Sequence, residues 1–227
     1  MYQPKMLISG QWIVGGSDVE LPVLNKFSGQ TIAQIQEATE IQVEEAVAAA
    51  QAAFEGEEIT PHRRFQILEK ASRLLLEGAK ELAEILVQEV GKTIRESRSE
   101  VNSAAAALLN AAEEAKRIDG ETIPVEANPG SERRFAVVMH TPSGPVCAIT
   151  PFNAPLNQAA HKIASAIAAG NPVLLKPSEQ TPITAYRLAQ ILTEAGLPAG
   201  HLAVVFGRGA TVGEQLLKDP RFSRYTF

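Results

Sequence analysis

Asn153, in the segment ITPFNAP (Ile149–Pro155), is the first residue whose sequence context suits a catalytic role. Pro151 and Pro155 lie two residues to either side of Asn153 and stiffen the backbone, so the side-chain amide is presented in a fixed direction. A preorganised amide N–H stabilises developing negative charge, as an oxyanion site requires. Asparagine is also a common N-cap residue, and the spacing alone favours a cap for the helix that follows.

Lys176 and Glu179 lie in the next such segment, LLKPSEQTP (Leu174–Pro182). A lysine at the carboxyl end of a strand, with a glutamate three residues later, can hydrogen-bond a ribose, because the ammonium donates and the carboxylate accepts from two hydroxyls. A glutamate there also repels a ribose 2′-phosphate and so favours NAD over NADP. Taken alone, the same two residues fit a surface ion pair at least as well.

The third segment, FGRGATVG (Phe206–Gly213), contains glycines with the spacing G-x-G-x-x-x-G. This spacing is one residue longer than the dinucleotide fingerprint, although the segment follows a strand-like stretch and opens a helix-like one, as such a loop should. Gly207 and Gly209 are the residues that would let the backbone approach a ligand. Glycines also occur in turns for steric reasons, so this pattern does not by itself identify a nucleotide site.

The single cysteine, Cys147, has neighbours that argue against a role as nucleophile. It lies within the apolar run PVCAI, with no base or lysine beside it, and a buried thiol in such a setting is inert. The histidines are scattered along the chain and have no metal-ligand spacing, so no metal site is expected.

Apolar stretches alternate regularly with helix-like stretches from Pro145 onward. This alternation indicates parallel βαβ units with helices on both faces of the sheet. The sequence therefore predicts an α/β fold with a Rossmann-like parallel sheet, and ligands in such sheets bind at the carboxyl ends of the strands. The three segments above all lie at such ends. The expected strands are 145–149, 172–176, 202–206 and 222–227, and the expected helices are 156–169, 182–195 and 211–217.

Residues 1–120 are expected to form N-terminal hairpins and helices of the same cofactor-binding domain. Two extended stretches, 6–14 and 23–38, each carry a central turn signal and indicate hairpins that cover the core rather than join its sheet. Apolar residues at helical spacing, together with capping signals, then predict four helices over residues 39–119.

Residues 121–144 have a different character. Turn residues at Asn128–Gly130 and Pro142–Gly144 enclose a strand-like stretch, Phe135–His140. This composition is typical of an extended arm that leaves the main body and returns. The apolar face of such an arm needs a partner, and another subunit is the natural one, so we expect the arm to serve oligomerisation.

Composition and charge exclude several classes of protein. The 45% hydrophobic and 21% charged residues are typical of a soluble globular domain. A formal charge of -5 leaves no basic surplus for a phosphate backbone, so no nucleic acid is expected as a partner. No apolar run approaches the ~20 residues of a membrane span, and the N-terminus lacks the pattern of a secretory signal. One cysteine fits a reducing compartment, so the sequence predicts a cytoplasmic protein.

Taken together, the segments ITPFNAP, GNPVLLKPSEQTP and AGLPAGHLAVVFGRG, in this order and spacing, resemble the NAD(P)-dependent aldehyde dehydrogenases. FSGQTIAQIQEAT, EVGKTIRES, GETIP and TPSGPV extend the resemblance over essentially the whole chain. By this resemblance Asn153 is a catalytic residue, whose amide helps to hold the oxyanion of a thiohemiacetal. Lys176 and Glu179 would contact the adenosine ribose. The full set of implied cofactor-binding residues is Ile149, Thr150, Pro151, Phe152, Lys176, Glu179 and Gly209.

The sequence departs from the family at two positions beside Asn153. Phe152 stands where many members have tryptophan, and Ala154 where many have a larger residue. Both departures bear on packing or on the substrate tunnel, while neither removes the amide of Asn153. The variant PFNAP suggests a small or polar aldehyde, of the lactaldehyde or semialdehyde kind.

The resemblance implies oxidation of a small-molecule aldehyde to a carboxylic acid with NAD, or alternatively NADP, through a cysteine thiohemiacetal. It also implies a homodimer or homotetramer. The family's T-G-S segment, general-base glutamate and catalytic cysteine would all follow Phe227. The core 145–227 is therefore expected to be truncated, the catalytic domain absent and the fragment alone inactive. Two alternatives stay open: a catalytically inactive nucleotide-binding or assembly module, and an acyl-phosphate or acyl-thioester reductase of the same superfamily.

Overall fold

A parallel sheet of four short strands lies at the centre of the molecule, which a computed structural model describes over residues 1–227. β8 lies between β7 and β9, and β10 pairs with the other side of β7. Helices cover both faces, so the residues of β8 and β9 are buried throughout rather than alternating. The four strands fall within the predicted stretches: β7 (Val146–Ile149), β8 (Val173–Lys176), β9 (Leu202–Val204) and β10 (Arg224–Thr226).

The first hairpin extends this sheet, so the expectation that it would only cover the core is wrong. β1 (Met6–Ile8) pairs antiparallel with β9 through Leu7 and Val204, and β2 (Gln11–Ile13) pairs with β1. The strand order is therefore β10-β7-β8-β9-β1-β2. The physical reason is that all three side chains of β1 are apolar and buried, so this strand needs cover on both faces.

The second hairpin, β3 (Glu20–Leu24) and β4 (Thr31–Gln36), forms a separate two-stranded sheet. Burial varies along β4 as in a strand that packs one face on the body and leaves the other in water. The chain then enters α1 (Glu40–Glu55), and just before this helix the N–H of Ala38 donates to the carbonyl of Phe206 at 2.9 Å. This bond ties the hairpin to the segment that follows β9.

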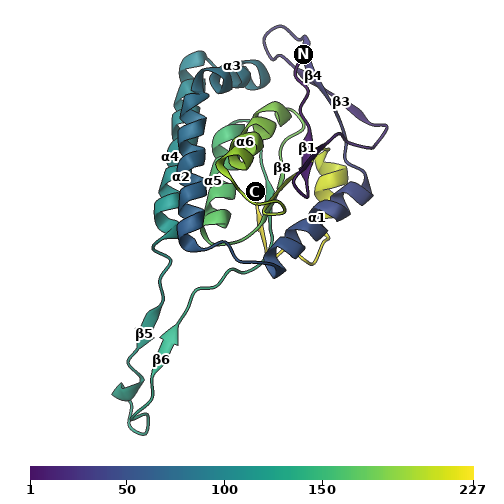
Figure 1. The fold of residues 1–227 in the computed structure, drawn as a ribbon. Helices are drawn as coiled ribbons and strands as arrows, with labels where there is room; N and C mark the ends of the chain where they lie inside the picture. The colour runs from purple at the N-terminus through teal and green to yellow at the C-terminus, as the bar shows by residue number, and fades with distance from the viewer.

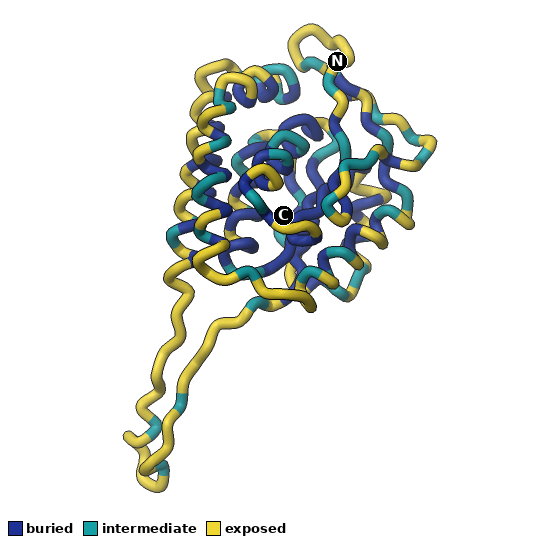
Figure 2. The backbone as a smooth tube through the Cα atoms, in the orientation of Figure 1, coloured by how far each residue is buried: buried dark blue, intermediate teal, exposed yellow.

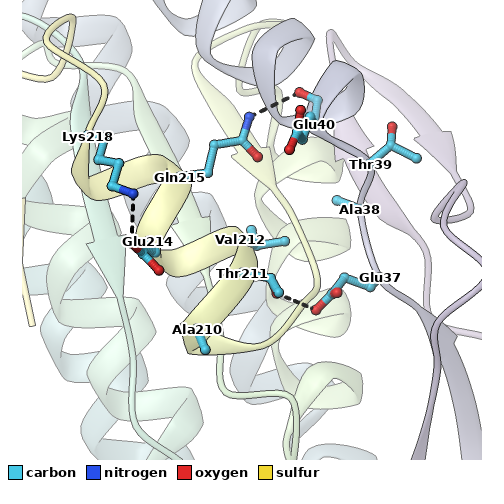
Figure 3. A pocket seen from close by; sticks show the side chains of 10 residues that line it. All are labelled: Glu37, Ala38, Thr39, Glu40, Ala210, Thr211, Val212, Glu214, Gln215 and Lys218. Atoms are coloured by element: carbon cyan, nitrogen blue, oxygen red, sulfur yellow. Dashed lines mark hydrogen bonds and ion pairs between the residues drawn. The ribbon is translucent and has the colours of Figure 1, made fainter.

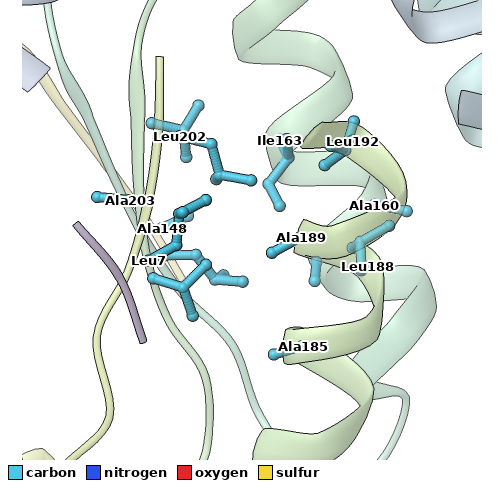
Figure 4. Close-up of a cluster of buried hydrophobic side chains, with 14 of the residues drawn as sticks. Leu7, Ala148, Ala160, Ile163, Ala185, Leu188, Ala189, Leu192, Leu202 and Ala203 are labelled. Carbon is cyan, nitrogen blue, oxygen red and sulfur yellow. The ribbon is translucent and has the colours of Figure 1, made fainter. Parts of the chain in front are cut away.

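Two helices, α5 (Pro155–Ala168) and α6 (Pro182–Ala195), pack on one face of the sheet, while α1 and the short α7 (Glu214–Leu217) lie on the other (Figure 1). Figure 4 shows the leucine, isoleucine and alanine side chains of α5 and α6 facing the strands. The small alanines let these helices approach the sheet closely, and the larger residues fill the space between them.

An outer layer of helices covers α5 and α6: α2 (Pro61–Glu77), α3 (Ala79–Val90) and α4 (Ile94–Ala115). Two of the predicted caps are present. The Thr60 side chain accepts a hydrogen bond at the start of α2, and Gly91 ends α3 in a left-handed conformation. α4 ends at Ala115, slightly earlier than the sequence suggests. No helix is both long and apolar enough to span a bilayer.

The segment between α4 and β7 leaves the body as a long arm (Figure 1). β5 (Glu121–Ile123) and β6 (Ala136–Val138) pair only with each other, and almost the whole arm is exposed (Figure 2). Phe135 is 80% exposed and Met139 is 76% exposed, although both are apolar. Exposed apolar residues gathered in this way are typical of an interaction surface.

Candidate functional site

The strand order reverses between β7 and β10, and the predicted residues lie at this point. The chain passes from β7 through α5 to β8, and through α6 to β9, before it returns through α7 to β10 on the other side of β7. Helices before and after such a reversal lie on opposite faces, which leaves a crevice at the carboxyl ends of the strands. We call the loops that follow β7, β8 and β9 the carboxyl edge.

The loop after β7 has a buried base and an exposed tip. Thr150 is buried, and its N–H donates to the carbonyl of Lys176 at 3.1 Å, which joins this loop to the end of β8. Ile149 is half-buried as the last residue of β7, whereas residues 151–153 are exposed. The buried Oγ1 atom of Thr150 has no hydrogen-bond partner in the protein. Such an atom is costly to bury unless water or a ligand satisfies it.

Asn153 does not cap α5, so the interpretation that the spacing alone favoured is wrong. The N-cap residue is Ala154, whose methyl group accepts no hydrogen bond. The N–H groups of Leu156 and Asn157 donate instead to Oε1 of Glu100 on α4, at 3.0 and 3.2 Å. The side chain of Asn153 is therefore free of the helix cap and lies at the exposed tip of the loop.

Lys176 is the last residue of β8 and is only 3% exposed. Its Nζ donates to the carbonyl of Pro177 at 3.0 Å and lies 3.7 Å from a carboxylate oxygen of Glu179. Burial lowers the pKa of this ammonium, and the carboxylates of Glu179 and Glu37 partly offset the effect. A surface ion pair does not describe this arrangement, because the ammonium is held inside the carboxyl edge with the partly exposed Glu179 beside it.

The glycine loop after β9 continues as a π turn, Gly209–Gly213, before α7 begins, where the sequence predicts a helix over 211–217. A Cβ added to Gly209 would meet nothing within 4 Å, so this residue faces open space. A Cβ added to Gly213 would lie 3.8 Å from Cδ and Cε of Lys176. The structure thus brings the π turn against the lysine that ends β8.

Glu37 fixes the loop after β9, although no motif in the sequence points to it. Its buried carboxylate accepts from the backbone N–H of Arg208 and from the Thr211 hydroxyl, both at 2.7 Å, and from the Arg208 guanidinium. Burial raises the pKa of Glu37, but the hydrogen bonds from Arg208 and Thr211 outweigh burial and leave it below its ordinary value. Arg208 is 171 residues further along the chain, so no local spacing signals this contact.

A hollow of about 650 Å³ lies between the start of α1 and α7 (Figure 3). Hydrogen bonds join its walls: the Thr211 hydroxyl donates to Glu37, and Nε2 of Gln215 donates to the carbonyl of Glu40 at 3.1 Å. None of the residues predicted to bind a cofactor lines it. The hollow shares the π turn with the carboxyl edge, but the predicted residues lie outside it, so the candidate site is the carboxyl edge.

Cys147 lies in β7 and is fully buried. Burial, with a smaller effect from the Asp219 carboxylate, raises the pKa of this thiol to about 12. The thiolate is the nucleophilic form of cysteine, so this residue is unreactive at neutral pH. Elsewhere, no three His, Cys, Asp or Glu side chains are grouped so that they could hold a metal ion.

Comparison with known proteins assigns the family. The model of the aldehyde dehydrogenase family matches residues 12–227. The chain belongs to the aldehyde dehydrogenase family. A 3-sulfolactaldehyde dehydrogenase from Priestia megaterium is 49% identical over 222 residues, and a phenylacetaldehyde dehydrogenase from Pseudomonas fluorescens is 39% identical over 228 residues. Each alignment covers 98% of this chain but only 46% and 45% of the respective relative. The chain spans about half the length of the curated relatives it matches.

Solved structures of aldehyde dehydrogenases and related enzymes share the fold. An NADP-dependent glyceraldehyde-3-phosphate dehydrogenase from Bacillus halodurans, solved with NADP, matches with a TM-score of 0.94 at 30% identity, over 100% of this chain and 48% of that chain. An NAD-dependent aldehyde dehydrogenase from Sinorhizobium meliloti matches with a TM-score of 0.92 at 34% identity, over 99% and 45%. The predicted α/β fold, a parallel sheet with flanking helices, is confirmed.

Proposed function

We propose that this chain is the cofactor-binding part of an NAD(P)-dependent aldehyde dehydrogenase, which oxidises an aldehyde to a carboxylic acid through a cysteine thiohemiacetal. The observation that carries the proposal is the buried Lys176 ammonium with Glu179 beside it, one strand away from the loop that presents Asn153. A Rossmann-like sheet binds its nucleotide at this edge. Membership of the aldehyde dehydrogenase family supports the same conclusion.

The residues of the carboxyl edge fit a dinucleotide. Lys176 offers hydrogen-bond donors and Glu179 offers acceptors, which suits the hydroxyls of a ribose. The buried Thr150 hydroxyl has no partner in the protein, so a ligand atom could satisfy it. Gly209 leaves open space where a side chain would stand in the way of a ligand. In this proposal Lys176, Glu179 and Gly209 hold the adenosine end of the cofactor, and residues 149–152 line the rest.

NAD is the proposed preference, with NADP as the alternative. The Glu179 carboxylate would repel a phosphate on the 2′-hydroxyl of the ribose. Arg208, on the neighbouring loop, does not supply a free positive charge for that phosphate, because Glu37 already pairs with its guanidinium. The relative from Bacillus halodurans that was solved with NADP keeps the alternative open.

Asn153 is the one residue of this chain with a proposed part in the chemical step. Its side-chain N–H would donate to the aldehyde oxygen as negative charge develops there during attack by the thiolate of the thiohemiacetal-forming cysteine. The nicotinamide, when bound, would supply the hydride acceptor for the later step. Cys147 cannot act as the attacking thiol, because it is buried and its pKa is raised to about 12. We infer that the 227 residues by themselves bind the cofactor and do not oxidise an aldehyde.

The proposed substrate class is a small polar aldehyde. Relatives named for such substrates include the 3-sulfolactaldehyde dehydrogenase of Priestia megaterium and an aspartate-semialdehyde dehydrogenase of Pseudomonas canavaninivorans, which is 38% identical over 209 residues. The sequence PFNAP is consistent with this substrate class. Phe152 and Ala154, the neighbours of Asn153, stand where many family members have tryptophan and a larger residue.

The arm, residues 121–144, is proposed to join subunits into a homodimer or homotetramer. Its strands pair only with each other, so nothing in the chain itself covers the apolar side chains of Phe135, Val137 and Met139. A second copy of the chain would bury them by adding to the edge of the two-stranded sheet.

Titration of the ¹⁵N-labelled chain with NAD, followed by NMR, tests the cofactor proposal. We expect the backbone amide signals of the three loops to shift together, namely those of Ile149, Thr150, Phe152, Lys176, Ser178, Glu179 and the π turn. Lys176→Ala should abolish these shifts, whereas Lys80→Ala, which removes an exposed lysine of the outer helix α3, should leave them unchanged. An absence of shifts, or shifts confined to other surfaces, would overturn the proposal.

A second titration tests the preference between the two cofactors. Glu179→Gln removes the charge that would repel a 2′-phosphate but keeps the size of the side chain. We expect this variant to bind NADP more tightly relative to NAD than the wild type does, by roughly tenfold, which is the effect of ~1.4 kcal/mol of repulsion. An unchanged ratio would remove Glu179 as the basis of the preference.

A further inference from the structure

Two buried glutamates on the outer helices, Glu100 on α4 and Glu89 on α3, make the same kind of contact at the carboxyl edge. Oε1 of Glu100 accepts from the N–H groups of Leu156 and Asn157, the second and third residues of α5. Glu89 accepts, at 2.6 and 2.9 Å, from the two corresponding N–H groups of α6. The first turns of α5 and α6 are therefore each held by a carboxylate from an outer helix.

These N–H groups are the ones that an N-cap side chain normally satisfies. At both helices the local cap makes no such bond. The side chain of Ala154, the N-cap of α5, has no acceptor atom, and the hydroxyl of Thr181, the N-cap of α6, is buried without a partner. The glutamates of α3 and α4 therefore replace the missing local caps.

Glu100 is held in place by the turn between α3 and α4. Its second carboxylate oxygen pairs with the ammonium of Lys92. Lys92 lies between Gly91, which ends α3 in a left-handed conformation, and Thr93, whose capping box with Glu96 starts α4. Because a buried carboxylate needs a charged or hydrogen-bonded partner, this pairing fixes the oxygen that faces α5.

The capping of α5 by Glu100 has a consequence for Asn153, which comes directly before the N-cap of this helix. An asparagine at the start of a helix is drawn to the free N–H groups of the first turn. Glu100 occupies those groups, so the amide of Asn153 makes no hydrogen bond to the helix and stays exposed. The flanking prolines then keep the loop from folding back.

We propose that Glu100 is a positioning residue for Asn153: by capping α5 from α4, it keeps the asparagine amide out of the helix cap and available to a ligand. The inference rests on the proposed function only for the catalytic role of Asn153. The capping contact itself involves no cofactor or substrate. Glu89 supports α6 in the same way, behind the loop of Lys176 and Glu179.

A double-mutant cycle tests the proposal through stability. In the wild-type chain Asn153 caps nothing, so Asn153→Ala should change the ratio of folded to unfolded protein by less than about twofold. In a Glu100→Ala background the vacated N–H groups are open to Asn153, which should take over the cap. Asn153→Ala should then lower the ratio by about fivefold, as the loss of an N-cap does. Equal effects in the two backgrounds, measured by urea unfolding, would overturn the proposal.

Glu89→Ala is the matched control, because it removes the same kind of cap from α6 instead of α5. In that background the effect of Asn153→Ala should stay at its wild-type value, and a larger effect would count against a specific link to Glu100. If Glu100→Ala does not fold, Glu100→Gln keeps an acceptor oxygen but removes the charge. The side-chain NH₂ signals of Asn153 should then shift in Glu100→Gln and not in Glu89→Gln, and the absence of that difference would overturn the proposal.

The two proposals fail in different experiments. Coupling between Glu100 and Asn153 without NAD-induced shifts would leave the capping role standing and remove the cofactor proposal. NAD-induced shifts without coupling would do the reverse.

Discussion

At the scale of single residues, the fold buries four charged side chains at or behind the carboxyl edge and gives each of the four a partner. Lys176 pairs with Glu179, Glu37 accepts a backbone N–H from the loop after β9, and Glu89 and Glu100 accept N–H groups from the first turns of α6 and α5. A buried charge without a partner would cost several kcal/mol of folding free energy. Removing one member of a buried pair therefore destabilises the fold more than removing one member of a surface ion pair. These residues couple the geometry of the three loops to the N-terminal elements of the chain.

Cys147 gives a direct test of burial in the central sheet. Because the thiol is fully buried and its pKa is raised to about 12, iodoacetamide should not modify the native chain at pH 8. The same reagent should label the chain completely in 8 M urea, where the thiol has the reactivity of a free cysteine. Mass spectrometry of both samples measures the difference, and rapid labelling of the native chain would contradict the placement of β7.

Glu89 makes stability depend on pH. Burial raises its pKa from 4.5 to about 7, against the opposing effect of hydrogen bonds from Thr184 and Ile183. A carboxyl group with a higher pKa in the folded chain stabilises the fold below its unfolded pKa, and this contribution is lost as the pH rises through the folded value. The free energy of unfolding of the wild type should therefore fall between pH 4.5 and about 7, relative to that of Glu89→Gln.

Urea unfolding of both proteins at a series of pH values measures this difference. All other groups titrate alike in the two proteins, so the comparison isolates Glu89. A difference that stays constant with pH would show that the carboxyl group has the same pKa in the folded and unfolded chains.

The site residues that could be identified from the sequence contact residues close to them in the chain. The site residues that could not be identified contact residues far away in the chain. Lys176 and Glu179 are three residues apart, so their pairing follows from the chain itself. Glu37 and Glu100 act on partners 171 and 56 residues away, and no spacing within a helix or loop signals such a contact. The cap predicted for Asn153 was wrong for the same reason, since a distant carboxylate took the N–H groups that local rules assign to the asparagine.

At the scale of elements, the alternation of strands and helices was predictable because each βαβ unit is local in sequence. The place of the first hairpin was not. Its strand β1 is a short apolar run, which fits a cover strand and a core strand equally well until its partner is known. That partner, Val204 of β9, lies almost the whole length of the chain away from Leu7.

The turn from β9 to α7 allows a matched pair of substitutions. A Cβ at position 207 would lie 2.3 Å from Cγ2 of Val212 and 3.0 Å from Cγ of Glu37, so Gly207→Ala should lower the free energy of unfolding by about 1–3 kcal/mol. A Cβ at position 209 would meet nothing within 4 Å, so Gly209→Ala should be almost neutral for stability. Urea unfolding of the two variants is the measurement, and equal effects would contradict the packing of this turn.

At the scale of the whole molecule, the arm is separable from the body. Its strands make their hydrogen bonds to each other, so the body should still fold when residues 121–138 are replaced with a short Gly-Ser linker. If the arm joins subunits, the same deletion should reduce the assembly to a monomer in analytical ultracentrifugation. A milder variant, Phe135→Ser, should weaken the assembly in a concentration-dependent way. An arm-deleted chain that sediments like the wild type would remove the arm from the interface.

The antiparallel pairing of β1 with β9 has a consequence for how the chain is made. During synthesis β1 leaves the ribosome long before its neighbour β9, which follows α6 in the chain. β1 can pair with β2 at once, but its other edge has no partner until β9 has emerged. Contacts of such long sequence separation slow folding and leave hydrophobic surface exposed to aggregation in the meantime. Until translation has passed Val204, the apolar strand β1 therefore lacks its neighbour in the central sheet.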